Sequence, residues 1–278
     1  MEKPARVMTI AGSSSGGSAG IQADLKTFQE LDVHGMSVIT AIVARHPVTN
    51  QNVHLQTLEA IEAQFFTARR QIGLDAIKIG MLFSKEIIAK VAELLEQAKI
   101  DKIVLDPVMV GKLDSKLLAD DAVDLLTEKL IPKATIITPN MPEASFLLGG
   151  RPVKTVEDII QAAIDLHKLG PNYVLVKGGR LAGPAIDVLY DGQTLTAFEA
   201  PRIPTKNTSG AGCTYSAAIT AEIAKGSTVE KAVQVAKEFV TASIAYGFSY
   251  TELVGPTYLA ALRNKGMPYP IKIQQISK

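Results

Sequence analysis

The chain has 278 residues, of which 47% are hydrophobic and 21% charged, a composition that supports a large buried core. Its 29 Lys+Arg against 28 Asp+Glu give a net charge of +1, which excludes the strong basic field usual in nucleic-acid-binding proteins. The single cysteine excludes an internal disulfide and multi-cysteine zinc sites, and the 4 histidines show no HExxH pairing.

The sequence also shows no export or membrane signal. Residues 1–6 lack the apolar core and small-residue cleavage site of a secretory signal. No uninterrupted apolar run is long enough to cross a bilayer. We therefore expect a cytoplasmic protein that binds small molecules and has neither a membrane nor a nucleic-acid partner.

Short β-rich runs alternate with longer runs of helical spacing along most of the chain. The rhythm changes where Asp191-Gly192 separates two β-rich runs, a pattern typical of a hairpin. This order predicts an α/β fold in one domain, residues 1–278, with a doubly wound, mostly parallel sheet, helices on both faces and a small antiparallel edge hairpin. In chain order the predicted elements are a strand at 6–11, a helix at 21–31, a strand at 36–43, a helix at 58–72, a strand at 76–79, a helix at 85–98, a strand at 102–105, a helix at 115–130, a strand at 135–138, a helix at 156–169, strands at 173–176, 186–190 and 194–198, and helices at 213–224, 228–245 and 258–263.

Polar clusters follow several of these predicted strands. In open parallel sheets, ligands bind beyond the carboxyl ends of the strands, so these clusters are expected to meet at one edge. Their shared position is a stronger indication of a site than any one of them. The clusters are 12–20, Asp106-Pro107, Thr138-Pro139-Asn140, Lys177-Gly178-Gly179 and the turn at 210–213.

The turn Gly210-Ala211-Gly212 stands directly before Cys213 and an apolar helical run at 215–224. A glycine turn that opens a helix offers backbone N–H groups and a positive dipole end to an anion. A thiol in the same field is expected to have a lowered pKa and to act as a base or nucleophile. The alternative is a small buried apolar cysteine. Acyl transfer and phosphoryl transfer both remain open on this segment alone.

The other clusters also allow two interpretations each. Asp106 and the Asn140-x-x-Glu143 pattern suit a hydrated Mg²⁺ ion, whereas Asn140 and Glu143 also suit a capping box, and both can hold together. Lys177 could contact a phosphate oxygen, or it could be a solvated lysine in a turn. Arg45-His46 could contact a ring substrate or its phosphate, or the two could be polar residues of a surface loop.

The glycine-rich segment 12–20 fits neither GxGxxG nor GxxxxGK[ST], which disfavours a dinucleotide oxidoreductase and a Walker P-loop.

Taken in order, the motifs resemble the ribokinase-like superfamily over nearly the whole chain, and within it the vitamin kinase branch of pyridoxal and hydroxymethylpyrimidine (phosphate) kinases. The most specific match is Gly210-Ala211-Gly212-Cys213-Thr214, where many superfamily members carry Asp in place of the cysteine. The other matching segments are 9–12, 19–26, Lys78-Ile79-Gly80-Met81-Leu82, Asp106-Pro107-Val108-Met109, Thr138-Pro139-Asn140-x-x-Glu143 and Lys177-Gly178-Gly179.

The resemblance implies a ribokinase-like, usually dimeric kinase that uses ATP and Mg²⁺ to phosphorylate a hydroxymethyl group on a heteroaromatic ring. It leaves a monovalent-cation requirement open. Cys213 would take the hydroxyl proton, and the N–H groups of Gly210, Ala211 and Gly212 would hold charge on the phosphoryl group. Asp106 and Glu143 would help to hold the metal. The implied nucleotide-binding residues are Asp106, Thr138, Asn140, Glu143, Lys177, Gly178, Thr205, Asn207, Thr208, Ser209 and Lys237, and the implied substrate-binding residues are Gly12, Ser13, Ser14, Gly20, Arg45, His46, Met81 and Val108.

Departures from the pyrimidine-kinase pattern favour a pyridine substrate. Pyrimidine kinases of this family usually show Ala-Gln-Asn where this chain has Ala44-Arg45-His46, and Asp where it has Ser14. A site without the pyrimidine-reading amide discriminates against that ring. The segments 28–32 and 254–256 also look more like the pyridoxal kinases of the branch. We therefore expect a pyridoxal/pyridoxine/pyridoxamine kinase of vitamin B6 salvage, with a hydroxymethylpyrimidine (phosphate) kinase of thiamine synthesis as the alternative.

Two further departures, together with Ser14, motivate a third hypothesis, a nucleotide- or vitamer-binding protein with low turnover. Some pyridoxal kinases of this type carry a second cysteine in the loop that reads Val110-Gly111-Lys112 here, so a two-thiol mechanism is not open to this chain. The histidine usual before the glycine turn is Ser209.

Overall fold

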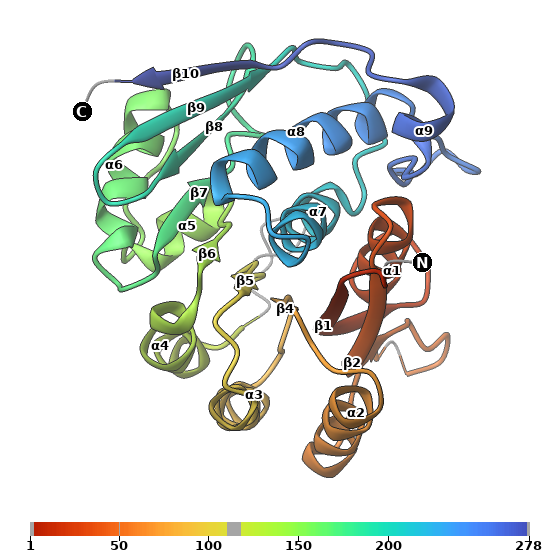
Figure 1. Cartoon of the computed structure of the whole chain (residues 1–278). Coiled ribbons are helices and arrows are strands. Elements are labelled where there is room, and N and C mark those ends of the chain that lie inside the picture. Colours follow the sequence, from red (N-terminus) through yellow and green to blue (C-terminus); the bar gives the residue numbers. More distant parts are fainter. Residues whose placement is uncertain (1–2, 50, 110–117, 277–278) are drawn as a thin grey trace.

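The computed structural model describes residues 3–49, 51–109 and 118–276. Within these residues, strands join into a ten-stranded sheet of order β10-β9-β8-β7-β6-β5-β4-β1-β2-β3 (Figure 1). The strands are β1 (Arg6–Ser14), β2 (His34–Val43), β3 (Val53–Leu55), β4 (Ala76–Ile79), β5 (Ile103–Leu105), β6 (Ile136–Ile137), β7 (Tyr173–Val176), β8 (Ala185–Tyr190), β9 (Leu195–Ala200) and β10 (Lys272–Ile276).

The centre of the sheet is parallel and its edges are antiparallel. β1, β2, β4, β5, β6 and β7 pair in parallel, β3 runs antiparallel to β2, and β8, β9 and β10 form an antiparallel edge beside β7. The structure thus confirms the predicted α/β class, a mostly parallel sheet with antiparallel edge strands.

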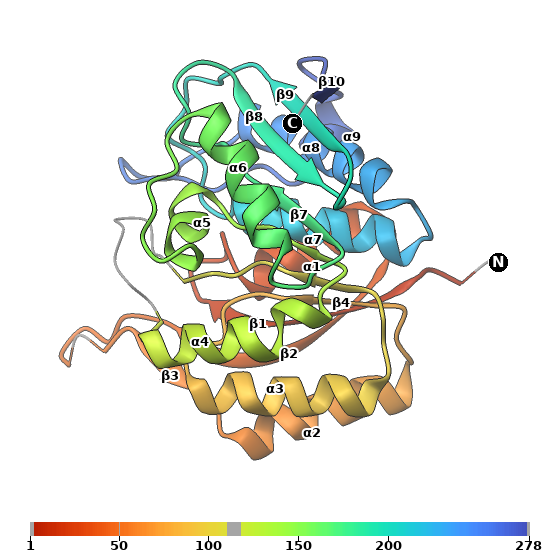
Figure 2. The ribbon, with the colours of Figure 1, turned by 90° about the vertical axis from the view of Figure 1, so that its left-hand side faces the viewer.

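Helices cover both faces of the sheet, as Figures 1 and 2 show. One layer holds α2 to α6, and the other holds α1, α7 and α8. All four residues of β4 are buried, because both of its faces are covered. The helices are α1 (Ile21–Glu30), α2 (Leu58–Gln71), α3 (Lys85–Ala98), α4 (Asp120–Lys129), α5 (Met141–Leu147), α6 (Val156–His167), α7 (Ala211–Ala224), α8 (Val229–Ala245) and α9 (Ala261–Lys265). Among the described residues, no helix combines the length and apolarity that a membrane span requires.

Several boundaries differ from the sequence prediction. α7 begins at Ala211 rather than at Cys213, and α9 covers Ala261–Lys265 rather than 258–263. The start of the helix predicted at 115–130 lies outside the described residues, and α4 is described from Asp120. The hairpin loop is longer than Asp-Gly, since Tyr190 pairs with Leu195 and β9 begins only there. The Asp191 carboxylate stabilises this loop by accepting the N–H groups of Gln193 at 2.7 Å and Thr194 at 2.5 Å.

Candidate functional site

The first turn of α7 lies against the loop that follows β1. Gly210 precedes the helix with φ 85°, and an added Cβ would lie 1.7 Å from the carbonyl oxygen of Ser18. Gly20 in the same loop donates its N–H to the Cys213 sulfur at 3.4 Å. The two glycine-rich segments, which are far apart in sequence, therefore form one surface, with the half-buried Cys213 between them.

The N–H groups of the turn are not all equally available to a ligand. The Ala211 N–H donates to the Thr208 carbonyl at 3.2 Å, so this predicted donor already closes the turn. Gly210 has no side-chain cap above it, as suits a helix end that accepts an anion.

Ser209 connects the turn to the loop after β1. Its hydroxyl lies 2.9 Å from that of Ser18, and the Ser209 backbone pairs with the segment 255–257. Ser209, which stands where the family usually has a histidine, is therefore buried, at 8% exposed, and its hydroxyl is paired with that of Ser18.

Single replacement of Ser18 or Ser209 by alanine is expected to lower the free energy of unfolding by about 1 kcal/mol, the usual value of a neutral hydrogen bond. The double variant is expected to lose less than the sum, because both changes remove the same bond. Urea unfolding of the four proteins measures the coupling, and strictly additive losses would show that the two hydroxyls do not interact.

A second cluster forms where β5, β6 and β7 end. Asp106 is 2% exposed and accepts hydrogen bonds from Thr138 at 3.1 Å, Lys177 at 2.8 Å and Ser216 of α7 at 3.2 Å. The Lys177 ammonium also points towards the turn, because a Cβ at Gly212 would lie 3.5 Å from it. The structure therefore brings the predicted Asp106, Thr138 and Lys177 together beside the first turn of α7.

Glu143 lies next to this cluster, and both interpretations of its motif are compatible with the geometry. Asn140 and Glu143 form a capping box, with both reciprocal bonds at 2.9 Å. Burial raises the pKa of Glu143 to about 7, Lys177 opposes this, and the negative charge of Asp106 adds to it. Two buried carboxylates that repel each other are suited to share a cation.

The donor set fits a magnesium ion that is completed by phosphate. Within the described part of the chain, no group of three or more His, Cys, Asp or Glu side chains forms a ready metal centre. Mg²⁺ usually takes only one or two carboxylates and fills its shell with phosphate oxygens and water. Asp106 and Glu143 match that requirement.

Asp24 and Lys78, which lie in the matching segments 19–26 and 78–82 but have no predicted role, form a buried ion pair. Both side chains are 0% exposed, with the Lys78 ammonium 2.8 Å and 2.9 Å from the two Asp24 carboxylate oxygens. A lysine in the middle of the apolar segment 76–79 was the signal that could have indicated a buried, paired lysine, although not the identity of its partner, because a lysine is almost never fully buried unless it is paired.

The ionisation of Cys213 differs from the expectation. Burial raises the pKa of the Cys213 thiol, and the charge of Lys78 is the largest influence that lowers it, opposed by Asp24 and Asp106. The position at a helix start predicts a lowered pKa, whereas burial raises the thiol pKa in the described structure.

Asp187 makes two further buried contacts with residues that are predicted to bind the nucleotide. Lys237 of α8 is 4% exposed and pairs with Asp187 at 2.6 Å, and Asp187 also accepts the Gly178 N–H at 2.9 Å. Lys237 is thus connected to the Lys177-Gly178 loop through the Asp187 carboxylate, and its ammonium already has an acidic partner.

In the segment 205–209, the Asn207 amide donates to the Gly247 carbonyl at 3.3 Å and accepts from the Gly255 N–H at 3.0 Å. The Thr205 hydroxyl accepts the Asn207 N–H at 3.1 Å, and Thr208 is exposed. Asn207 therefore joins the segment to the loop after α8.

The predicted substrate residues divide into two groups. Gly12, Ser13 and Ser14 end β1 and Gly20 ends the loop that follows it. The Gln22 side-chain amide accepts the Ser14 N–H and donates to the Ser13 hydroxyl, at 2.8 Å each. Met81 follows β4 and Val108 follows Asp106, so both lie at the same carboxyl edge of the sheet.

Arg45 and His46 are exposed, beyond the end of β2. The His46 Nδ1 accepts N–H bonds from Val48 at 3.3 Å and Thr49 at 3.1 Å, which makes it a turn-forming residue in this conformation. The Nδ1 bonds fit the surface-loop interpretation, and the predicted substrate contact of His46 stays a prediction.

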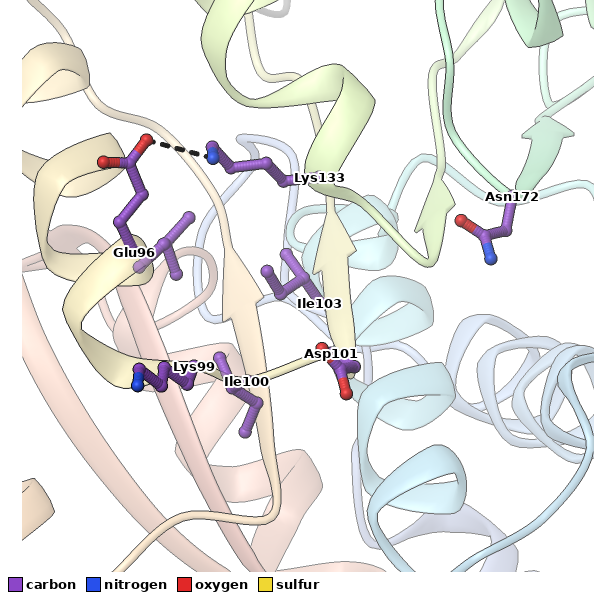
Figure 3. A pocket seen from close by; sticks show the side chains of 8 residues that line it. Glu96, Lys99, Ile100, Asp101, Ile103, Lys133 and Asn172 are labelled. Carbon is purple, nitrogen blue, oxygen red and sulfur yellow. Dashed lines mark ion pairs between the residues drawn. The ribbon is translucent and has the colours of Figure 1, made fainter.

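Two surface hollows lie at the opposite edge, at the amino ends of the strands. One, of about 460 Å³, has Lys99, Lys133 and Asn172 among its lining residues (Figure 3). Figure 3 shows Glu96 and Lys133 facing each other there, an ion pair of 3.1 Å. The other, of about 1160 Å³, includes Arg6 and Asp75. Neither includes any of the predicted site residues.

Known proteins match both the sequence and the structure. A family described as phosphomethylpyrimidine kinase matches residues 14–258. A pyridoxine kinase of Bacillus subtilis is 47% identical over 93% of this chain and 97% of its own, and a hydroxymethylpyrimidine/phosphomethylpyrimidine kinase of the same organism is 41% identical over 93% and 96%. The structure of the Staphylococcus aureus pyridoxal kinase in complex with AMP-PCP and pyridoxal is 36% identical, with a TM-score of 0.90 over 99% of this chain and 100% of that one.

The match extends over most of the chain and includes the motifs at the carboxyl edge of the sheet, so the chain belongs to the phosphomethylpyrimidine kinase family, a ribokinase-like group of vitamin kinases.

Proposed function

We propose that this protein transfers the γ-phosphoryl group of ATP to the hydroxymethyl group of pyridoxal, pyridoxine or pyridoxamine, in vitamin B6 salvage. The observation that carries the proposal is the meeting of three features at one edge of the sheet: the half-buried thiol of Cys213, the uncapped glycine turn before it, and the Asp106–Lys177 pair. Kinase activity on a vitamin is the family's property, and the relatives include kinases of both rings.

In the proposed reaction, the Cys213 thiolate accepts the proton of the substrate hydroxyl as its oxygen attacks phosphorus. The first turn of α7 holds charge on the transferred group with its N–H groups and its dipole. Lys177 moves its hydrogen bond from Asp106 to a phosphate oxygen. Such a transfer depends mainly on positioning and electrostatics, which the buried contacts around the turn supply.

ATP is the proposed donor, because several similar pyridoxal kinase structures contain ADP or AMP-PCP. Mg²⁺, held by Asp106 and Glu143, would neutralise phosphate charge when bound. The segment 205–209 and the loop around Gly178 are the proposed nucleotide contacts.

A pyridine ring is preferred over a pyrimidine ring in this proposal. The segment Ala44-Arg45-His46 lacks the amide expected for pyrimidine reading, and Ser14 replaces the usual Asp. The identity to the Bacillus subtilis pyridoxine kinase, 47%, also exceeds that to the pyrimidine kinase, 41%.

The test measures kcat/KM for pyridoxal, pyridoxine, pyridoxamine and hydroxymethylpyrimidine side by side, with ATP and Mg²⁺. We expect pyridoxal or pyridoxine to exceed the pyrimidine at least about tenfold, as one missing or unmatched polar contact of about 1.4 kcal/mol would give. A preference for hydroxymethylpyrimidine would establish the thiamine-synthesis alternative, which the family name and the second relative favour. Turnover of none of the four would leave the binding-protein hypothesis.

We further propose that the 278 residues form a single kinase domain that acts as a cytoplasmic homodimer. Apolar side chains at the β2–β3 edge support the dimer, since Ile42 is 41% exposed, Leu55 51% and Leu58 38%. Light scattering on the purified protein measures the mass directly, and a monomer would contradict this part of the proposal.

A further inference from the structure

The proposed phosphoryl transfer leaves the buried charges of Asp24 and Lys78 without a role. Each is 0% exposed, and the Thr9 hydroxyl donates a further bond of 2.6 Å to the Asp24 carboxylate. Burying two charges costs desolvation that their attraction barely repays, so such a pair contributes little net stability compared with an apolar pair. Stability alone therefore does not explain why two charges lie in the core.

The position of Lys78 follows from the alternation of β4. Ile77 and Ile79 pack into the core beneath α2 to α6, whereas Ala76 packs with α1 and α7. Because side chains alternate along a strand, Lys78 faces α1 and α7. Its ammonium also lies close to the strand end, since a Cβ at Gly80 would be 3.3 Å from it.

Hydrogen bonds connect the pair to the thiol. The Asp24 N–H donates to the Gly20 carbonyl at 3.0 Å in the first turn of α1. The N–H of the same Gly20 donates to the Cys213 sulfur at 3.4 Å. The bond between Asp24 and Lys78 thus fixes the start of α1 on β4, and the start of α1 carries the donor that holds Cys213.

The charges facing Cys213 come from each element packed around it. Lys78 on β4 favours the thiolate, while Asp24 on α1 and Asp106 after β5 oppose it. Lys177 at the end of β7 also interacts with the thiol, but its ammonium is bonded to Asp106 and is directed at phosphate in the proposed reaction. Lys78 is therefore the cation that favours the thiolate and keeps its own partner, Asp24, throughout the proposed reaction.

We propose that Lys78 is a positioning residue for Cys213. The Lys78 ammonium, held by the Asp24 carboxylate that also accepts the Thr9 hydroxyl, balances the negative charge of the thiolate. The thiolate then accepts the substrate hydroxyl proton and becomes the neutral thiol as the oxygen–phosphorus bond forms and the bond to ADP breaks. The role in turnover rests on the proposed kinase function, whereas the charge coupling between Lys78 and Cys213 does not.

The single cysteine of the chain makes a direct test available, because alkylation of a thiol can occur only at Cys213, and peptide mass spectrometry identifies that adduct. The rate of reaction with iodoacetamide, an uncharged reagent, is measured against pH for the unmodified protein and for Lys78→Met. We expect the apparent pKa of the thiol to rise by about one unit or more, so that alkylation at pH 8 falls about tenfold.

The matched control is Lys237→Met, which removes another buried lysine from a carboxylate partner, Asp187 at 2.6 Å. The alkylation profile of this variant is expected to stay within about twofold of the unmodified protein, because its ammonium is directed at Asp187 and the Ala185 carbonyl rather than at the thiol.

A second variant keeps the test decisive if Lys78→Met does not fold. Lys78→Met/Asp24→Leu removes both charges and leaves no unpaired ion in the core. Its apparent thiol pKa is expected between those of the unmodified protein and Lys78→Met, because the opposing charge of Asp24 is lost as well. An unchanged alkylation profile in whichever variant folds, judged by circular dichroism and thermal melting, would overturn the inference.

Kinase assays separate the two proposals. If the unmodified protein phosphorylates pyridoxal, Lys78→Met is expected to lower kcat with little change in KM for ATP and to move the acid limb of the kcat–pH profile upward. If the unmodified protein phosphorylates none of the tested rings, the proposed function fails, and the alkylation result still decides whether Lys78 controls the charge of Cys213.

Discussion

Replacement of Cys213 by alanine is expected to lower kcat for pyridoxal phosphorylation by about a hundredfold to ten-thousandfold, the usual contribution of a general base. The sulfur is the atom that the loop after β1 and the first turn of α7 enclose together, and Gly20 donates to it at 3.4 Å. Alanine removes the proton acceptor but keeps the turn and its N–H groups. KM for ATP is therefore expected to change little, since Asp106, Lys177 and the turn remain.

Two further variants separate the base from the packing. Cys213→Ser keeps a group of similar shape but with a weak base, and is expected to be nearly as slow as Cys213→Ala. Cys213→Asp restores a base of the kind that other members of the superfamily carry, and is expected to recover part of the rate. The increase in melting temperature on addition of ATP, which reports binding, should persist in all three variants. A Cys213→Ala protein that retained more than about a tenth of kcat would show that another group takes the proton.

The layered fold was predictable where an amphipathic period or a short apolar run is bounded by polar residues. The helix at Lys85–Ala98 and the strand at Tyr173–Val176 have the predicted bounds, because apolar spacing and flanking polar residues mark both ends. β10 was not predicted, because Lys272 to Gln275 are exposed and its sequence shows no apolar alternation. β3 has only three residues, too few for a period. Both edge strands form because they pair with a neighbouring strand, and the sequence of the segment itself does not indicate that pairing.

The candidate site was predictable in part, from the order of the strands. The rule that parallel strands end at one edge placed Asp106, Thr138 and Lys177 together, and their contacts agree with that prediction. The partnership of Asp24 with Lys78 was not predictable, since periodicity says that a residue is buried but not which residue it meets. His46 shows a further limit, because its position after a strand allowed both a ligand contact and a surface loop, and the sequence did not indicate that its Nδ1 accepts turn N–H groups.

Gly210→Ala is expected to lower both stability and activity strongly. Gly210 has φ 85°, and a Cβ there would lie 1.7 Å from the Ser18 carbonyl oxygen and 2.9 Å from its carbonyl carbon. The left-handed backbone alone costs about 1–2 kcal/mol for an L-residue, and displacement of the 18–20 backbone adds to it, for a total of about 3 kcal/mol in the free energy of unfolding. Moving that loop also moves the Gly20 donor from the Cys213 sulfur, and a shift of about 1 Å in a catalytic group lowers kcat about a hundredfold.

Gly226 provides a control at the other end of the same helix. It has φ 94°, similar to that of Gly210, but a Cβ there meets nothing within 4 Å. Gly226→Ala therefore carries the backbone strain without the collision and is expected to lose only about 1 kcal/mol, with kcat unchanged. The difference between the two variants measures the contact between the loop after β1 and the first turn of α7. Equal losses of stability, with kcat retained in both, would mean that the loop yields freely to a methyl group and does not hold Cys213 in place.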